Sequence, residues 1–457
     1  MTLPVPDGWR VRLDPRTRRV GTGLRLLTPT GRLLRLGRGG EEALAHLEEG
    51  VASERERRLG RSLLAAGAAF PVVSSVSADD VTVVIPVRDR TAALSRCLAA
   101  VGSADVIVVD DGSADPDSVR AVAEGFGVRY LHRLNGGPAA ARNSALPLLH
   151  KDFVAFLDSD CVPPTGWLEQ LRAHLDDPAV AAVAPRVVGG PRSPLDLGPH
   201  AARVIPGGEV SYVPTACLLF RVSALTPFDE RLRYGEDVDL VWRTIDGGWD
   251  VRYDPSVVVQ HEEPPLLRDR LIRRYRYGQS AGPLAQRHPT RLAHLVVSPW
   301  PTAVVVLLHV RRPLLALAAA ATMTIRLDRT IEDPPTSAWA VGQGVRGQAL
   351  GLGRALGLLG PLGWLLVARH RRLAPVLVAP YLVEWNQRRP PLNPVAFGAV
   401  ALLDQAAYGA GVVAGCLRHR TGRPLLPKLS AENDKTLGNA GVFVGKLGLG
   451  ERETART

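Results

Sequence analysis

Cysteine, lysine and aromatic residues are scarce in this chain of 457 residues. The four cysteines are scattered, with no Cys-x-x-Cys pair and no histidine cluster; they are Cys97, Cys161, Cys217 and Cys416. This spacing predicts reduced thiols rather than a disulfide framework. Residues 1–24 are polar and rich in arginine, without the apolar stretch of a secretory signal. We therefore expect a cytoplasmic protein.

Long apolar runs are also few. Only Val395–Leu417 reaches the roughly 20 residues that span a bilayer, and it contains Asp404. The other apolar runs within residues 291–426 are shorter or contain proline. We expect helices there that pack on the domain of residues 79–290 or lie on the inner face of a membrane, with the basic residues 368–372 near the headgroups. Helices that span the membrane remain an alternative.

Positive charge outweighs negative charge, and the net charge of +11 comes almost wholly from arginine. Arginine suits phosphate and carboxylate partners because its planar guanidinium forms paired hydrogen bonds with them. A basic chain alone would equally suit nucleic acid or anionic lipid. However, residues 1–78 show neither an aromatic stacking platform nor a clearly basic recognition helix. Nucleic acid is therefore not expected as a partner.

The apolar pattern divides the chain into four segments. Residues 1–78 show short strand patterns and two helices, the second beginning at a possible capping box of Ser53 and Glu56, which predicts a small α+β domain. Residues 79–290 alternate strand and helix patterns, as in an α/β domain with a mainly parallel sheet. Residues 291–426 are the apolar helical region. The polar, glycine-rich residues 427–457 are expected to be disordered.

Two acidic pairs follow predicted strands of the second segment. Asp110 and Asp111 come after IVV, and Asp158 and Asp160 come after AFL. Ligands of such sheets bind beyond the carboxyl ends of the strands. A divalent cation could bridge the second pair, whose carboxylates repel each other, to the two phosphates of a nucleotide-sugar. A turn at the second pair, or a helix N-cap at the first, is the simpler alternative.

A third acidic group lies in FDERLRYGEDVDLVWR, residues 228–243. Gly235 permits a close approach of the backbone to a ligand, and Glu236 and Asp237 then open a predicted helix. A carboxylate there suits a general base that takes a proton from a hydroxyl. Favourable charge at a helix N-terminus is the alternative explanation.

A basic stretch follows at residues 268–291, with seven arginines and one aspartate. Such a stretch could stabilise a departing diphosphate, bind an interface as an amphipathic helix, or simply face solvent. We select Arg276, Tyr277 and Gln279 as candidates for the functional subset.

These motifs, with NGGPAAARNSAL between them, resemble the family 2 glycosyltransferases of the GT-A fold from about Val81 to His261. The resemblance implies that Asp237 is the base of an inverting transfer. It also implies Mg²⁺ or Mn²⁺ at Asp160 and His261, although a histidine that caps a strand end is the alternative for His261. We expect the following residues to bind the nucleotide-sugar: Pro86, Arg88, Asp110, Asp111, Asp158, Ser159, Glu236 and Arg276.

The order of the segments adds a narrower resemblance. Residues 1–78 resemble the winged-helix-like PqqD domains that bind peptides, and nearly the whole chain resembles the glycosyltransferases of mycofactocin biosynthesis. This implies a donor such as UDP-glucose, a small acceptor derived from a ribosomal peptide, a β-1,4-glucan product, and a peptide or maturation-protein partner for residues 1–78. Two alternatives remain: a membrane glycosyltransferase with a lipid-linked or polysaccharide acceptor, and a peptide-binding scaffold with an inactive transferase domain.

Overall fold

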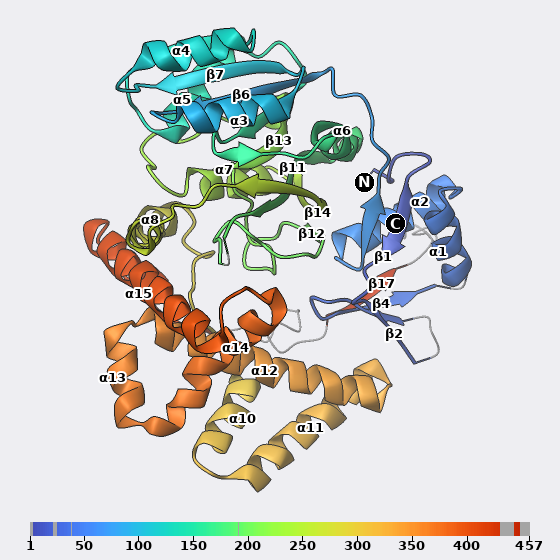
Figure 1. The fold of residues 1–457 in the computed structure, drawn as a ribbon. Coiled ribbons are helices and arrows are strands. Elements are labelled where there is room, and N and C mark those ends of the chain that lie inside the picture. Colours follow the sequence, from blue (N-terminus) through green and yellow to red (C-terminus); the bar gives the residue numbers. More distant parts are fainter. Residues whose placement is uncertain (1–2, 22–24, 38, 191, 430–442, 448–457) are drawn as a thin grey trace. The chain divides into compact units, whose positions relative to one another are not determined.

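The computed structural model describes residues 3–21, 25–37, 39–190, 192–429 and 443–447 (Figure 1). These residues group into two compact units. One unit comprises residues 73–287, and the other combines residues 1–72 with residues from 288 onward. The predicted segments 1–78 and 291–426 thus belong largely to the same unit.

The unit of residues 73–287 is built on one mixed sheet. Its strands are β6 (Val81–Val87), β7 (Asp105–Asp111), β8 (Arg129–Arg133), β9 (Phe153–Leu157), β10 (Cys161–Val162), β11 (Val180–Val188), β12 (Ala202–Arg203), β13 (Cys217–Arg221) and β14 (Asp250–His261). Their order is β10-β14-β11-β13-β9-β6-β7-β8, with β12 paired to β14. Strands β9, β6, β7 and β8 pair in parallel, as do β11 and β14, whereas β13 is antiparallel to both of its neighbours. The predicted α/β class is confirmed.

Helices accompany this sheet: α3 (Thr91–Val101), α4 (Pro116–Gly125), α5 (Pro138–Ala145), α6 (Trp167–Arg172), α7 (Glu236–Asp246), α8 (Leu267–Gln279) and α9 (Ala281–Arg287). The N-cap of α4 is Asp115, whose carboxylate accepts the N–H of Ser118 at 3.1 Å. The alternative that Asp110 or Asp111 caps this helix is therefore wrong.

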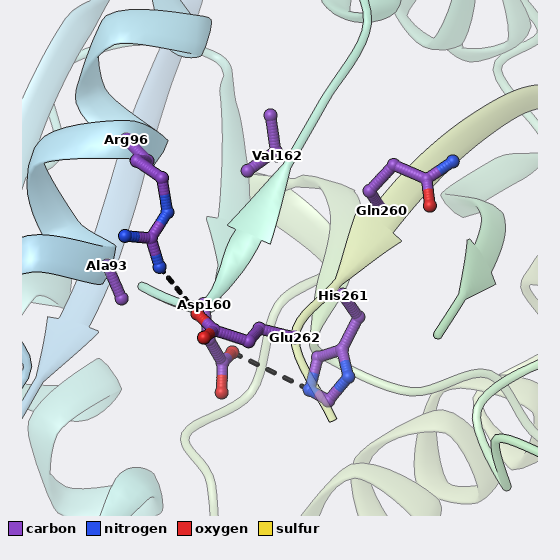
Figure 2. Close-up of a pocket in the computed structure, with 7 residues that line it drawn as sticks. All are labelled: Ala93, Arg96, Asp160, Val162, Gln260, His261 and Glu262. Carbon is purple, nitrogen blue, oxygen red and sulfur yellow. Dashed lines mark hydrogen bonds and ion pairs between the residues drawn. The ribbon is translucent and has the colours of Figure 1, made fainter. Parts of the chain in front are cut away.

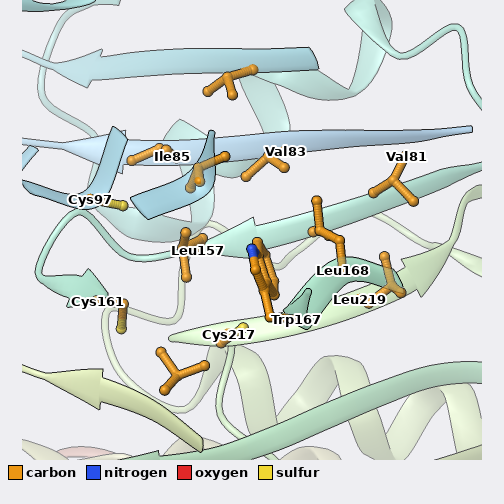
Figure 3. Close-up of a cluster of buried hydrophobic side chains, with 14 of the residues drawn as sticks. Val81, Val83, Ile85, Cys97, Leu157, Cys161, Trp167, Leu168, Cys217 and Leu219 are labelled. Atoms are coloured by element: carbon orange, nitrogen blue, oxygen red, sulfur yellow. The ribbon is translucent and has the colours of Figure 1, made fainter. Parts of the chain in front are cut away.

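The core of this unit joins the parallel strands to α3 and α6. Figure 3 shows Trp167 of α6 in one cluster with Leu157 of β9 and Cys217 of β13. Strand β9 is buried along its whole length, as a continuous apolar strand should be when both faces of the sheet are covered. All four cysteines are buried free thiols, as predicted, and burial raises the pKa of Cys217 well above its ordinary value.

The second unit contains the strands β1 (Arg10–Leu13), β2 (Arg18–Val20), β3 (Arg25–Leu27), β4 (Arg32–Leu36), β5 (Ala69–Val72), β15 (Val296–Val297), β16 (Lys428–Leu429) and β17 (Phe443–Leu447). Its helices are α1 (Gly40–Glu49), α2 (Glu54–Ala65), α10 (Pro299–His309), α11 (Pro313–Ile331), α12 (Pro334–Leu358), α13 (Pro361–Arg369), α14 (Ala374–Arg388) and α15 (Pro394–Arg418). The capping box of Ser53 and Glu56 at the start of α2 is confirmed.

The two parts of this unit share a hydrophobic core. Side chains from β2, β3 and β4 pack against side chains from α11 and α12; the buried members are Val20, Leu27, Leu33, Leu327, Ile331, Ala340 and Val341. Arg25 reinforces the contact by donating to the carbonyl of Ile331 at 2.9 Å. The N-terminal strands and the C-terminal helices therefore stabilise each other.

The structure adds two facts about the C-terminal region. Strands β16 and β17 lie in the segment 427–457 that is predicted to be disordered, and β17 pairs in parallel with β4; residues 430–442 and 448–457 are outside the described ranges. Within those ranges, α15 is the single helix long and apolar enough to cross a membrane. The α12–α13 pair would qualify only as one span bent by 117°.

Candidate active site

The predicted acidic residues meet at one edge of the sheet. Strands β6, β7 and β9 run parallel, and β14 has the same direction through β11 and β13. Their carboxyl ends therefore lie along the same edge, which carries Asp110 and Asp111 at the end of β7, Asp158 and Asp160 after β9, and His261 at the end of β14.

Arg142 of α5 links two of the acidic motifs. Its side chain is only 3% exposed, and it donates from Nη2 to Asp158 Oδ1 at 2.7 Å and from Nη1 to Glu236 Oε1 at 3.1 Å. We did not single out Arg142 from the sequence. The available signal was its position directly after three alanines of a small-residue helix, all of which are buried. The buried positive charge of Arg142 therefore balances the negative charge of both carboxylates.

The two acids at the start of α7 have unusual protonation behaviour. Burial raises the pKa of Glu236 to about 7, the charge of Asp237 adds to the effect, and Arg142 opposes it. Burial also raises the pKa of Asp237 above its ordinary value, while the N–H of Val238, donating at 2.8 Å, opposes this rise. A carboxylate with a raised pKa is a stronger base, so Asp237 is suited to accept a proton from a hydroxyl group.

Gly235 has a packing role in this structure. It is the N-cap of α7 with φ of 82°, and an added Cβ would lie 2.9 Å from Cβ of Ser280 and 3.0 Å from Cδ1 of Leu284. The close approach is thus to side chains at α9. Nearby, burial raises the pKa of Tyr277 to about 12, so this phenol stays protonated beside the acidic group.

Figure 2 shows the pocket that contains Asp160 and His261. Nε2 of His261 lies 3.6 Å from Oδ1 of Asp160, and Arg90 pairs with the other carboxylate oxygen. Across the pocket, Arg96 of α3 pairs with Glu262 at 2.6 Å. The cavity has a volume of about 460 Å³, with Ala93, Val162 and Gln260 completing its lining.

The residues around this pocket fit a metal ion that is shared with a substrate. Among the described residues, no group of three or more His, Cys, Asp or Glu side chains could hold a metal alone. Mg²⁺, however, is commonly bound by one or two carboxylates together with substrate phosphates. Burial and the charge of Asp158 raise the pKa of Asp160. A cation bound beside Asp160 would lower this pKa again. Nδ1 of His261 is buried without a hydrogen bond, although Glu263 lies 3.5 Å away.

Asp110 and Asp111 are buried and already serve the fold. Asp110 accepts the N–H of Ser113 at 2.9 Å and the hydroxyl of Tyr130 at 2.8 Å. Asp111 accepts the N–H groups of Gly136 at 2.9 Å and Gly137 at 2.7 Å, at the start of α5. The structure therefore places both at the predicted edge with structural partners, and their contact with a nucleotide remains a prediction.

The remaining predicted binding residues differ in their positions. Ser159 is buried between the paired aspartates, and Pro86 is half-buried in β6. Arg88 is exposed, with its Nε 3.5 Å from Asp89. Arg276 is exposed on α8, whereas Arg273 of the same helix pairs with Glu263 beside His261. Arg273 is thus a residue that we missed and that contacts the acidic cluster.

The chain is similar to known glycosyltransferases. The family profile described as Glycosyl transferase family 2 matches residues 82–223. The pre-mycofactocin glycosyltransferase of Mycobacterium tuberculosis is 39% identical over 466 residues, which cover 93% of this chain and 98% of the relative. The succinoglycan biosynthesis protein ExoU of Rhizobium meliloti is 30% identical, over 38% of this chain and 60% of its own. The glycosyltransferase AglE of Haloferax volcanii is 27% identical, over 44% of this chain and 72% of its own length.

Proposed function

Since the chain belongs to the family 2 glycosyltransferases, with their α/β GT-A fold, we propose that it transfers glucose from UDP-glucose to a small peptide-derived acceptor. The acceptor is pre-mycofactocin, and repeated transfer builds a β-1,4-glucan chain on it. The similarity to the pre-mycofactocin glycosyltransferase across 93% of the chain supports this acceptor. The observation that carries the chemistry is the position of Asp237 at the start of α7, beside Glu236, in a setting that raises its pKa.

The transfer is a single in-line displacement that inverts the anomeric carbon. The acceptor hydroxyl attacks from the face opposite the diphosphate, and Asp237 removes its proton. The bond between the anomeric carbon and the diphosphate oxygen breaks, and its electron pair leaves with the diphosphate. Arg142 holds Asp158 and Glu236 in place and balances their charge, because its buried guanidinium contacts both. Mg²⁺ or Mn²⁺ held by Asp160 and His261 would stabilise the charge of the diphosphate.

Residues 1–78 would bind a peptide or a maturation protein in this scheme. The support is the resemblance of their sequence pattern to PqqD-like domains. A lipid-linked or polysaccharide acceptor is the second candidate, favoured by α15, which is long and apolar enough to cross a membrane.

The variant Asp237→Asn tests the assignment of the base. It keeps the shape of the side chain, so we expect normal folding and normal binding of UDP-glucose, measured by calorimetry. Transfer should fall by roughly 10²–10⁴-fold because the amide cannot take the proton. Mass spectrometry of the acceptor, followed in steps of one hexose, measures the transfer.

Asp117→Asn provides the matched control, since Asp117 is exposed on α4. Near-normal turnover of Asp237→Asn would show that another group is the base. Consumption of the donor without any extended small acceptor would instead favour the lipid-linked or polysaccharide acceptor.

A further inference from the structure

The turn between α10 and α11 exposes a concentrated set of apolar side chains. Six residues within twelve positions are between 49% and 80% exposed: Val306, Leu308, Val310, Leu314, Leu315 and Leu317. The same two helices are anchored to their unit by Val304 and Ala316, which are 4% and 2% exposed. The exposed residues are therefore an ordered outer face of a packed helix pair. A concentration of exposed apolar side chains of this kind indicates an interaction site.

Helix α13 presents a second exposed apolar face. Leu362, Leu365 and Leu366 are 71%, 66% and 41% exposed, and their spacing of three and four residues places them on one side of the helix. Gly363 lies on the buried side. In Figure 1, the α10–α11 turn and the end of α13 both lie at the lower end of the helical region of this unit. We call these two apolar faces, with the arginines beside them, the leucine–arginine surface.

The charges on this surface are of one sign. Arg311 and Arg312 form the α10–α11 turn and are exposed. Arg369, the last residue of α13, and residues 370–372 directly after it are also exposed. The sequence has no acidic residue between Asp269 and Asp328, and none between Asp333 and Glu384. Both apolar faces thus carry arginines and have no acidic residue close to them in the sequence.

The combination of exposed apolar side chains and arginines indicates which partner can bind this surface. A second copy of the chain in a two-fold dimer would bring the same surface against itself, so arginines would face arginines. A bilayer with anionic headgroups accepts apolar side chains at the acyl boundary and attracts arginine at the headgroup level. We propose that the leucine–arginine surface docks this protein on an anionic membrane, with α13 and the α10–α11 turn lying in the interface rather than crossing the bilayer.

Vesicle co-sedimentation of the full chain tests this proposal. We expect binding to vesicles of phosphatidylcholine mixed with phosphatidylglycerol, weak binding to phosphatidylcholine alone, and release by added salt because salt screens the attraction. Each arginine near an anionic surface strengthens binding about fivefold. Arg311→Gln with Arg312→Gln should therefore weaken binding to the mixed vesicles about thirtyfold.

A second variant tests the apolar contribution. Leu314→Ser with Leu315→Ser should also release the protein from the mixed vesicles, with an unchanged thermal unfolding midpoint because both side chains are exposed. The matched controls are Leu134→Ser, a leucine that is 85% exposed in the other unit, and Arg55→Gln with Arg58→Gln, two exposed arginines of α2. Both controls should bind as the parent protein does.

Four results would overturn the proposal. They are equal binding to both vesicle types, an equal loss in the control variants, and a protein that stays in the membrane pellet after carbonate extraction, which would indicate spanning helices. The fourth is a dimer in solution, measured by sedimentation velocity, that the Leu314→Ser and Leu315→Ser variant abolishes, because the surface would then bind a second copy.

Discussion

Replacing Glu236 by glutamine should remove a large part of the pH dependence of stability. Glu236 is buried next to Asp237, and its pKa of about 7 lies above the ordinary value of 4.5. The folded protein therefore keeps a proton at Glu236 that the unfolded chain releases as the pH rises above 4.5. Stability contributed by this protonated group is lost as the pH rises from about 4.5 to about 7.

The size of the effect follows from the shift in pKa. One pKa unit corresponds to about 1.4 kcal/mol. Between about pH 5 and about pH 8, the shift of Glu236 should lower the free energy of unfolding of the parent protein by roughly 2–3 kcal/mol. Glutamine has nearly the same shape, does not titrate, and can still accept the hydrogen bond from Arg142. The Glu236→Gln variant should therefore be close to the parent in stability near pH 5 and roughly 2–3 kcal/mol more stable near pH 8.

Urea denaturation followed by circular dichroism at the two pH values measures this difference. Titrating groups distant from Glu236 change the stability of the parent and of the variant equally. Asp237 is coupled to Glu236 through its charge, so the difference reports the titration of this acidic pair. Glu124→Gln is the control, because Glu124 is exposed on α4 of the same unit. It should follow the parent at both pH values.

Two results would refute the reasoning. If Glu236→Gln loses as much stability as the parent between the two pH values, Glu236 does not titrate in this range in the folded protein. If the variant is less stable than the parent near pH 8, the ionised Glu236 and Arg142 form a net stabilising pair whose attraction exceeds the cost of burying the charge.

Four further outcomes are expected. Gly235→Ala should destabilise the protein by about 1–3 kcal/mol in urea denaturation, because its methyl group would lie 3.0 Å from a leucine of α9; Gly248→Ala, also at positive φ but with no neighbour within 4 Å, separates strain from crowding. Asp111→Asn should cost about 1.5–3 kcal/mol in the same assay, since the carboxylate accepts two backbone N–H groups. Chelation should abolish transfer and Mn²⁺ should restore it, and His261→Ala should weaken Mn²⁺ binding, measured by calorimetry, by at least roughly tenfold.

The sequence predicts the edge of the sheet at which the acids gather, because that depends on local patterns. Apolar runs that end in Asp110 and Asp158 indicate both the strand and its end, and parallel strands share an edge. The start of α7 at Glu236 and the capping box of α2 are also local signals, and both are confirmed.

The partners of these acids depend on contacts that are distant in sequence. The hydrogen bonds of Asp111 to Gly136 and Gly137 join residues 25 and 26 positions apart, and the ion pair of Arg142 with Glu236 joins residues 94 positions apart. Neither pairing leaves a periodic pattern, so both require the folded chain. The insertion of antiparallel β13 between β9 and β11 also depends on contacts that are distant in sequence, so it too requires the folded chain.

The division of the second unit between the two ends of the chain bears on its synthesis. The apolar faces of β2, β3 and β4 are completed by α11 and α12, which leave the ribosome roughly 300 residues later. At about 5–20 residues per second, the first 72 residues wait on the order of tens of seconds for this cover. Residues 73–287, a continuous stretch with its own core, emerge within that interval. The catalytic unit can therefore fold while the N-terminal strands are still exposed, so a chaperone of nascent chains would meet the N-terminal strands first.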